Sequence, residues 1–138
     1  MNHTPNLTRF RHTLLLVCIL MWASAFCLSH IPLPQLPDLP GKDKGLHFIG
    51  FAGLASILLL TLMAHGRGHD QKLLRRCAIT LLITAVYGAI DELTQPLVNR
   101  YGTGDDWLAD VAGSVAAVVV WGIVLSVLGK KKKPKTQP

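Results

Sequence analysis

The stretch WLADVAGSVAAVVVWGIVLSVL, residues 107–128, decides the fold class, because it is apolar almost throughout and contains Asp110 as its single charged side chain. A helix needs about 20 residues to cross the hydrocarbon core of a bilayer, with roughly 17–25 tolerated. The stretch has that length, and its apolar side chains do not alternate with polar ones, which excludes a strand of a membrane barrel. It therefore predicts a transmembrane helix.

Three further apolar runs lie upstream, at residues 13–29, 47–64 and 77–95. The first is short for a span, and the other two reach full length when their polar ends are included. Helices are the structure to expect for all of them, because a bilayer offers no water to an open backbone. The four runs together predict an all-α fold, an integral membrane four-helix bundle.

The composition agrees with this prediction. Half of the 138 residues are hydrophobic and 16% are charged, whereas a soluble domain usually carries about 25% charge. The charges crowd into the gaps between the apolar runs. We expect a cytoplasmic N-terminus at residues 1–12, one membrane domain at 13–128, and a basic, disordered cytoplasmic tail at 129–138.

Basic residues predict the orientation. Arg9 and Arg11 precede the first run, four Lys or Arg lie between the second and third runs, and five Lys follow the fourth. The other two connections hold only Lys42 and Lys44, and then Arg100. Lys and Arg favour the cytoplasmic side, so both termini are expected inside a multi-pass protein of the cytoplasmic (inner) membrane.

The net charge of +6 is explained by these flanking residues, which contact anionic lipids. Membrane lipids are therefore expected partners. Nucleic acid is not, because the chain has no platform of interleaved aromatic and basic residues.

The first run has an alternative interpretation as a cleavable secretory signal, because Arg9 and Arg11 are followed by an apolar stretch and then by Ala23-Ser24-Ala25. The bulky neighbours Trp22 and Phe26 argue against cleavage there. The connection that follows, residues 31–41, reads IPLPQLPDLPG. Its four prolines favour an extended backbone. We expect this segment to lie along the membrane surface or to cover the outer end of the bundle.

Ionisable side chains in membrane helices are rare unless they lie at the interface, are paired, or serve a function. In this chain they gather at one end of the last three runs, which the predicted orientation places at the outer face. The candidate binding residues are Asp43, Lys44, His47, Asp91, Glu92, Gln95, Arg100, Asp106 and Asp110.

Helical spacing places these residues on one stripe of each helix, because side chains four apart share a face. The pairs are Asp43 and His47, Asp91 and Gln95, and Asp106 and Asp110. The stripes are expected to point inward, since a charge facing lipid at mid-depth costs about 2.5 kcal/mol or more. We expect Lys44 and Arg100 to neutralise part of the acidic cluster. Close approach of the helices is helped by small residues at Gly50, Gly53, Gly88, Gly113 and Ala117.

A simpler role, helix capping, is open to Asp43, Asp105 and Asp106, because carboxylates stabilise a helix N-terminus. Capping does not explain Asp91 and Glu92. These two lie near a helix C-terminus, where negative charge is unfavourable. Asp110 lies a full turn inside its helix, and a histidine placed among several carboxylates is more than a packing residue. The group as a whole therefore predicts a functional site.

At these residues the sequence resembles the VanZ-like family of bacterial membrane proteins, named for a protein associated with resistance to the glycopeptide teicoplanin. The resemblance covers residues 40–128. It rests on an Asp-Lys-x-x-His element, an Asp-Glu-x-x-Gln element, an Arg five residues later and an Asp six residues further on, matched here by Asp43, Lys44, His47, Asp91, Glu92, Gln95, Arg100 and Asp106. Asp110 stands where the family usually has Asn. The resemblance implies a small helical protein of the cell envelope.

Three functions fit this pattern. The first is an envelope binding protein that recognises a cell-wall precursor, a lipid headgroup or a glycopeptide, and so contributes to glycopeptide resistance. The second is a metal-assisted hydrolase or transferase acting on a lipid-linked substrate, because His47 with several carboxylates is an adequate acid–base and ligand set. The third is a structural or ion-coupling subunit. No motif specifies a metal or another cofactor, although the carboxylates can accept a bridging divalent ion.

Overall fold

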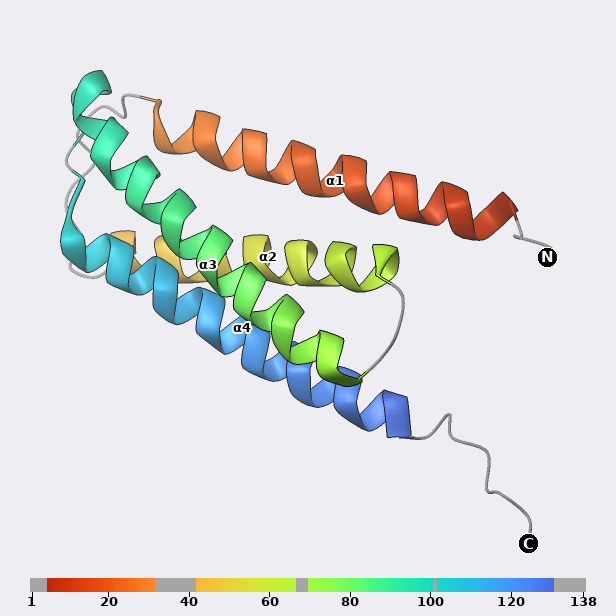
Figure 1. Cartoon of the computed structure of the whole chain (residues 1–138). Coiled ribbons are helices and arrows are strands. Elements are labelled where there is room, and N and C mark those ends of the chain that lie inside the picture. Colours follow the sequence, from red (N-terminus) through yellow and green to blue (C-terminus); the bar gives the residue numbers. More distant parts are fainter. Residues whose placement is uncertain (1–4, 32–41, 67–69, 101, 131–138) are drawn as a thin grey trace, which may run out of the picture.

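The computed structural model describes residues 5–31, 42–66, 70–100 and 102–130, and in these ranges every regular element is helical. The all-α prediction is therefore confirmed. The elements, shown in Figure 1, are α1 (Pro5–Ser29), α2 (Lys42–His65), α3 (Asp70–Thr94), the short 3-10 helix η1 (Gln95–Val98) and α4 (Gly104–Lys130).

Each helix begins before the apolar run that predicted it and covers all or nearly all of that run. α1 begins at Pro5 and α4 continues to Lys130, so both helices extend past the ends of their apolar runs. The expected division of the chain at residues 12 and 128 stays a prediction. Hydropathy marks only the apolar part of a helix, whereas Lys, Arg and Gln are themselves good helix formers. Most of the proline-rich connection, residues 32–41, and the tail residues 131–138 lie outside the described residues.

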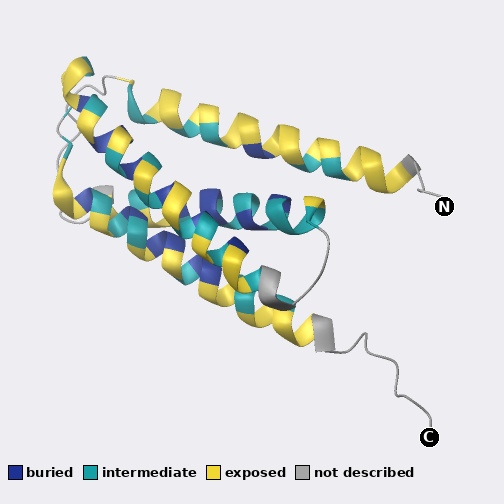
Figure 2. Ribbon diagram, in the orientation of Figure 1, coloured by how far each residue is buried: buried dark blue, intermediate teal, exposed yellow. Residues whose placement is uncertain are grey.

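All four long helices have the length and apolar composition needed to cross a membrane. Large apolar side chains cover their outer surfaces; Ile49, Leu74 and Leu82, for example, are 71%, 78% and 65% exposed. Figure 2 shows exposed positions along the outside of every helix and buried positions where α2, α3 and α4 face one another. Such a surface suits hydrocarbon rather than water. The chain is therefore a four-span integral membrane protein whose helices contact lipid.

The closest helix contact joins α2 and α4. A Cβ atom added at Gly113 of α4 would overlap the backbone carbonyl oxygen of Phe48 in α2. Gly88 of α3 is similarly confined, because a Cβ there would lie 3.1 Å from the ring of Phe51 and 3.0 Å from Asp110 Oδ2. These glycines let three backbones approach closely, as small residues commonly do between membrane helices.

Helix α1 lies at the edge of the assembly and packs mainly on α2 (Figure 1). It also reaches α3, because the rings of Trp22 and Tyr87 lie 4.7 Å apart and the Tyr87 hydroxyl donates a hydrogen bond of 3.3 Å to the Trp22 carbonyl. The end of α1 is thereby held beside the end of α3.

The turn between α3 and α4 begins where Pro96 follows Gln95. α3 ends at Thr94, one residue before the predicted end, and η1 continues the chain for a single tight turn. Asn99 then adopts a left-handed conformation with φ of 58°, which asparagine tolerates better than most residues. The N–H groups of Asn99 and Arg100 bond back to the carbonyls of Pro96 and Gln95. This turn brings the start of α4 beside the end of α3.

Candidate functional site

The centre of the polar end is a contact between His47 of α2 and Asp110 of α4. His47 Nδ1 lies 2.8 Å from Asp110 Oδ1, a hydrogen-bond distance. The Asp110 side chain is fully buried, and that of His47 is 12% exposed. The close α2–α4 approach at Gly113, one turn further along α4, allows these two short side chains to meet.

Glu92 brings α3 into the same centre. Its Oε1 lies 3.7 Å from His47 Nδ1, while its Oε2 accepts a 2.7 Å hydrogen bond from the backbone N–H of Thr103. Gly102 passes so close to Glu92 that an added Cβ would overlap the Glu92 carbonyl oxygen. Glu92 Oε2 therefore holds the chain segment that leads into α4, and Glu92 Oε1 faces His47.

A second part of the cluster surrounds Asp91. Gln95 Nε2 donates to Asp91 Oδ2 at 3.1 Å and lies 3.4 Å from Glu92 Oε1, so one amide links both carboxylates. Ser29 at the end of α1 donates a 2.6 Å hydrogen bond to Asp91 Oδ1. His30 Nδ1 lies 3.7 Å from the same oxygen. All four helices thus contribute to this polar cluster.

Asp106 takes part in the cap of α4, as the simpler interpretation allowed, but the capping acceptor is Thr103. The Asp106 backbone N–H donates to Thr103 Oγ1 at 3.2 Å, and that hydroxyl donates in turn to Asp106 Oδ2 at 2.6 Å. These two hydrogen bonds cap the first turn of α4 through Thr103 and hold the Asp106 carboxylate in place. It leaves Asp106 buried beside the other carboxylates of the cluster.

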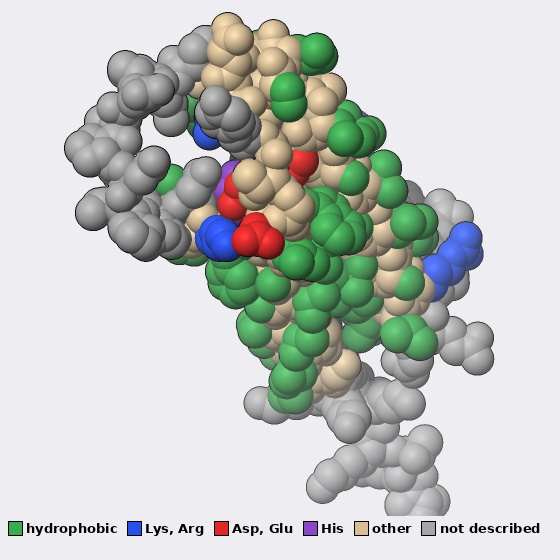
Figure 3. Space-filling view, turned by 90° about the vertical axis from the view of Figure 1, so that its left-hand side faces the viewer, with side chains coloured by type: hydrophobic (Ala, Val, Ile, Leu, Met, Phe, Trp, Pro, Cys, Tyr) green, Lys and Arg blue, Asp and Glu red, His purple; other side chains and the backbone are tan. Residues whose placement is uncertain are grey.

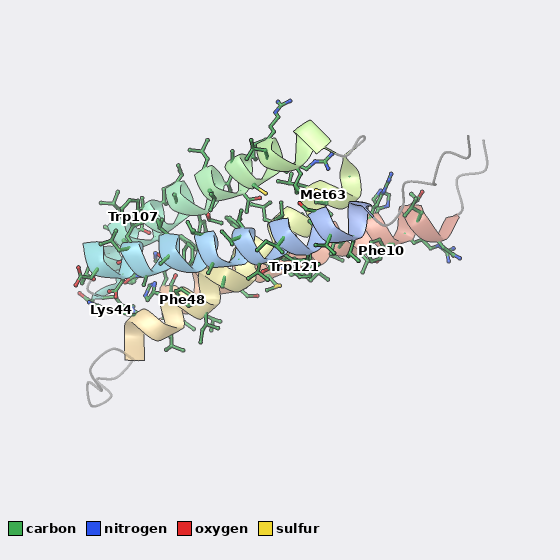
Figure 4. The ribbon with its side chains drawn as sticks, turned by 90° about the horizontal axis from the view of Figure 1, so that it is seen from below. Phe10, Lys44, Phe48, Met63, Trp107 and Trp121 are labelled. Carbon is green, nitrogen blue, oxygen red and sulfur yellow. The ribbon has the colours of Figure 1, made fainter. Side chains whose placement is uncertain are left out.

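The rim of the cluster is an exposed ion pair. Lys44 Nζ lies 2.7 Å from Asp105 Oδ2, with the two side chains 54% and 68% exposed. Figure 4 shows Lys44, Phe48 and Trp107 at this end of the helices and Met63, Trp121 and Phe10 toward the other. In the view onto the polar end, acidic, basic and histidine side chains lie close together beside hydrophobic side chains (Figure 3).

The structure brings together six of the predicted residues, which are buried or nearly so: His47, Asp91, Glu92, Gln95, Asp106 and Asp110. The polar stripes of α2, α3 and α4 therefore point inward toward one another, as predicted. The side chain of Asp43, whose backbone belongs to α2, lies outside the described residues. Within the described part of the chain the cluster has four buried carboxylates, and His47 and His30 lie within 4 Å of three of them.

Of the two cations expected to neutralise part of the acidic cluster, only Lys44 pairs with a carboxylate within the described residues. Lys44 pairs with exposed Asp105 at the rim. The Arg100 side chain makes no hydrogen bond or ion pair within the described residues, and it lines a pocket of about 310 Å³ with Pro96, Asn99 and Gly102. Both long cationic side chains are cheaper to keep near water than to bury, so they remain at the edge of the cluster.

Ser29, His30 and Thr103 join the cluster without having been predicted. Ser29 and His30 follow the first apolar run directly, and this polar pair at a span end was the available signal. Thr103 contributes through its backbone N–H and its hydroxyl. The N–H and the hydroxyl of Thr103 are not ionisable, so a pattern of ionisable residues does not reveal them.

The polar groups of the cluster are carboxylate oxygens, imidazole nitrogens, one amide and two hydroxyls. Such a set can accept hydrogen bonds from amines and hydroxyls, move protons, or hold a cation. No protein-family model, curated protein or solved structure matches the chain.

Proposed function

We propose that this chain is a VanZ-like protein of the bacterial cell envelope, and that its polar cluster binds an envelope ligand at the outer face of the membrane. The ligand is a cell-wall precursor, a lipid headgroup or a glycopeptide. The proposal rests on one observation: four carboxylates are buried together at one end of a membrane-spanning helix assembly. The residues of the three family-like sequence elements contribute most of this cluster.

The burial of these carboxylates argues for a role in binding. Removing a charge from water is expensive, and apolar residues of similar volume often stabilise a protein as well or better. Ionisable groups kept within membrane helices therefore commonly mark ligand or ion pathways. Neutral side chains would join these helices at lower cost than Asp91, Glu92, Asp106 and Asp110.

The layout of charge suggests how a ligand would be oriented. Negative groups lie inside the cluster, whereas Lys44 and Arg100 lie at its edge. Arg100 is the stronger candidate for an anionic group, because its guanidinium has no partner within the described residues and forks well onto phosphate or carboxylate. A ligand with an anionic group and nearby hydroxyls or amines would bind Arg100 through the anionic group and the buried carboxylates through its hydroxyls or amines.

The proposal includes an orientation and a location. Both termini are cytoplasmic, the polar cluster faces outward from the inner membrane, and the protein contributes to glycopeptide (teicoplanin) resistance. The positive charge at residues 67–76 and at the tail supports this orientation. A ligand in the outer leaflet or the wall would then reach the cluster without crossing the membrane.

Thermal unfolding of the purified protein in detergent tests the proposal. The probes are undecaprenyl-linked wall precursors, phospholipids and teicoplanin, each added to wild type, Asp91→Asn and Asp70→Asn. Asp70 begins α3 at the opposite end and provides the matched control. A ligand at about 100 times its dissociation constant stabilises a one-site protein by roughly 2.7 kcal/mol.

The proposal predicts a shift with one probe class that is lost in Asp91→Asn and kept in Asp70→Asn. Absence of any shift, in wild type as in a folded Asp91→Asn variant, would contradict the proposal and favour a structural role. Conversion of a bound precursor into a product would instead favour the hydrolase or transferase alternative.

A further inference from the structure

Three side chains from three different helices converge at the centre of the polar cluster. His47 comes from α2, Glu92 from α3 and Asp110 from α4, and one ligand-type atom of each lies within 4.8 Å of the other two. Imidazole nitrogen and carboxylate oxygen are both good ligands for divalent metal ions. Residues held on separate packed helices are also positioned more rigidly than residues on loops.

The spacing is close to that of a coordinated ion. Two ligand atoms about 2.1 Å from a tetrahedral Zn²⁺ lie roughly 3.4 Å apart. His47 Nδ1 and Glu92 Oε1 are separated by 3.7 Å, whereas His47 Nδ1 and Asp110 Oδ1 are separated by 2.8 Å. Binding therefore needs the hydrogen bond between His47 and Asp110 to open by a few tenths of an ångström. It also needs the ligand oxygens of Glu92 and Asp110, which lie within 4.8 Å of each other, to come to the same spacing.

A second, independent observation concerns the other oxygen of Asp110. This side chain is fully buried, yet its Oδ2 has no hydrogen-bond partner within the described residues. The oxygen lies toward α3, 3.0 Å from the position of a Cβ at Gly88, one turn before Glu92. A buried carboxylate oxygen without a partner is costly. A cation bound between α2, α3 and α4 would relieve that cost.

We propose that His47, Glu92 and Asp110 form a binding site for one divalent transition-metal ion, with Zn²⁺ the best match and Mn²⁺ next. The imidazole ligand favours these ions over Ca²⁺ and Mg²⁺, which prefer sites made of oxygen alone. Three protein ligands leave at least one coordination position for water or for an oxygen of a ligand. The site does not depend on the proposed envelope ligand, and its test uses the metal ion alone.

The charges of the site favour a divalent ion. Two buried carboxylates with a neutral imidazole balance a +2 charge. Metal and proton compete for the imidazole nitrogen, so loading the site displaces any proton held between His47 and Asp110, and binding is expected to strengthen as pH rises. A network closed only by its own hydrogen bonds would show neither metal binding nor proton release.

Calorimetric titration of the chelator-treated protein in detergent tests this inference. Zn²⁺, Mn²⁺, Mg²⁺ and Ca²⁺ are titrated separately, in two buffers that differ in ionisation enthalpy so that released protons are counted. The variants are Asp110→Asn and Glu92→Gln, and the matched control is Asp105→Asn, an exposed carboxylate on the same helix. Glu92→Gln keeps an oxygen that can accept the Thr103 hydrogen bond, so this variant preserves the fold if Asp110→Asn does not.

The expected result is one Zn²⁺ per chain, with proton release and weaker binding of Mg²⁺ and Ca²⁺. The site variants lose about tenfold or more in affinity, and Asp105→Asn keeps the wild-type value. Equal affinity in wild type and Glu92→Gln would overturn the proposal, because the ion would then be bound without Glu92. No Zn²⁺ binding by the folded wild type would overturn it as well. The proposed envelope function is tested separately by the thermal assay. If either of these two results is obtained and an envelope probe still shifts the unfolding temperature, the envelope function stands and the metal site does not.

Discussion

Two of the ion pairs at the polar end, His47 with Asp110 and Lys44 with Asp105, differ in how far they are exposed to water. His47 and Asp110 meet in a nearly dry environment, whereas Lys44 and Asp105 meet in the open at a similar distance. Removing one member of a buried pair strands its partner without a counter-charge, which is strongly destabilising. An exposed pair is screened by water and contributes little.

His47→Ala is therefore expected to lower the free energy of unfolding by about 3–5 kcal/mol, because Asp110 would remain buried and unpaired. Lys44→Ala should leave the free energy of unfolding nearly unchanged. Denaturant unfolding in detergent measures both variants. His47→Gln is the informative control, since its amide can donate to Asp110 and should recover part of the loss. An equally small effect of His47→Ala and Lys44→Ala would show that the buried contact does not stabilise the helix assembly.

At the level of elements, the site depends on how closely α2 and α4 approach. Gly113 lies against the Phe48 carbonyl, next to His47 in the chain. Gly122 lies two turns further along the same helix and has open space around its Cβ position. The two glycines therefore allow the same substitution to be compared in a tight and in an open position.

We predict that Gly113→Ala destabilises the protein by about 1–3 kcal/mol, because the added methyl must push α2 and α4 apart. Gly122→Ala should change stability by less than about 1 kcal/mol, since alanine is the better helix former and meets no neighbour. Thermal unfolding in detergent compares them. The account of helix packing fails if both substitutions have the same effect.

The distance between α2 and α4 also determines the geometry of the polar cluster. Moving α2 away from α4 lengthens the contact between His47 and Asp110, so Gly113→Ala should also weaken whatever the polar cluster binds. The probe found in the thermal assay, or Zn²⁺ in the calorimetric one, provides the measurement, and Gly122→Ala again serves as the control.

At the scale of the whole molecule, the orientation in the membrane decides which compartment the cluster faces. The prediction is that Gly104, at the start of α4, is outside the cell and that His65, at the end of α2, is inside. A variant in which Cys18, Cys27 and Cys77 are replaced by serine provides the background. Gly104→Cys should react with a membrane-impermeant maleimide in intact cells, and His65→Cys only after the membrane is opened. The reverse pattern would place the polar cluster in the cytoplasm.

The sequence was sufficient for the four spans, because long apolar runs have few structural solutions in a bilayer. It could not define the helix ends, since polar flanks such as residues 5–12 continue a helix without any hydropathy signal. In the cluster, side chains on one helical stripe were predictable from their spacing. The pairing of Lys44 with Asp105, and the lack of a partner for Arg100 within the described residues, were not predictable, because the placement of long side chains in water or in the interior is decided only once the helices are packed. Ser29 was missed because its role depends on where the end of α1 lies beside Asp91.

Native mass spectrometry of protein purified from bacterial membranes tests the claim that the polar cluster holds an envelope ligand. Wild type and Asp70→Asn are expected to carry a bound species with the mass of an envelope lipid or lipid-linked precursor. Asp91→Asn should be released from the detergent without it. Wild-type protein that appears only as the bare 15.0 kDa chain, or an adduct that persists equally in Asp91→Asn, would contradict the claim.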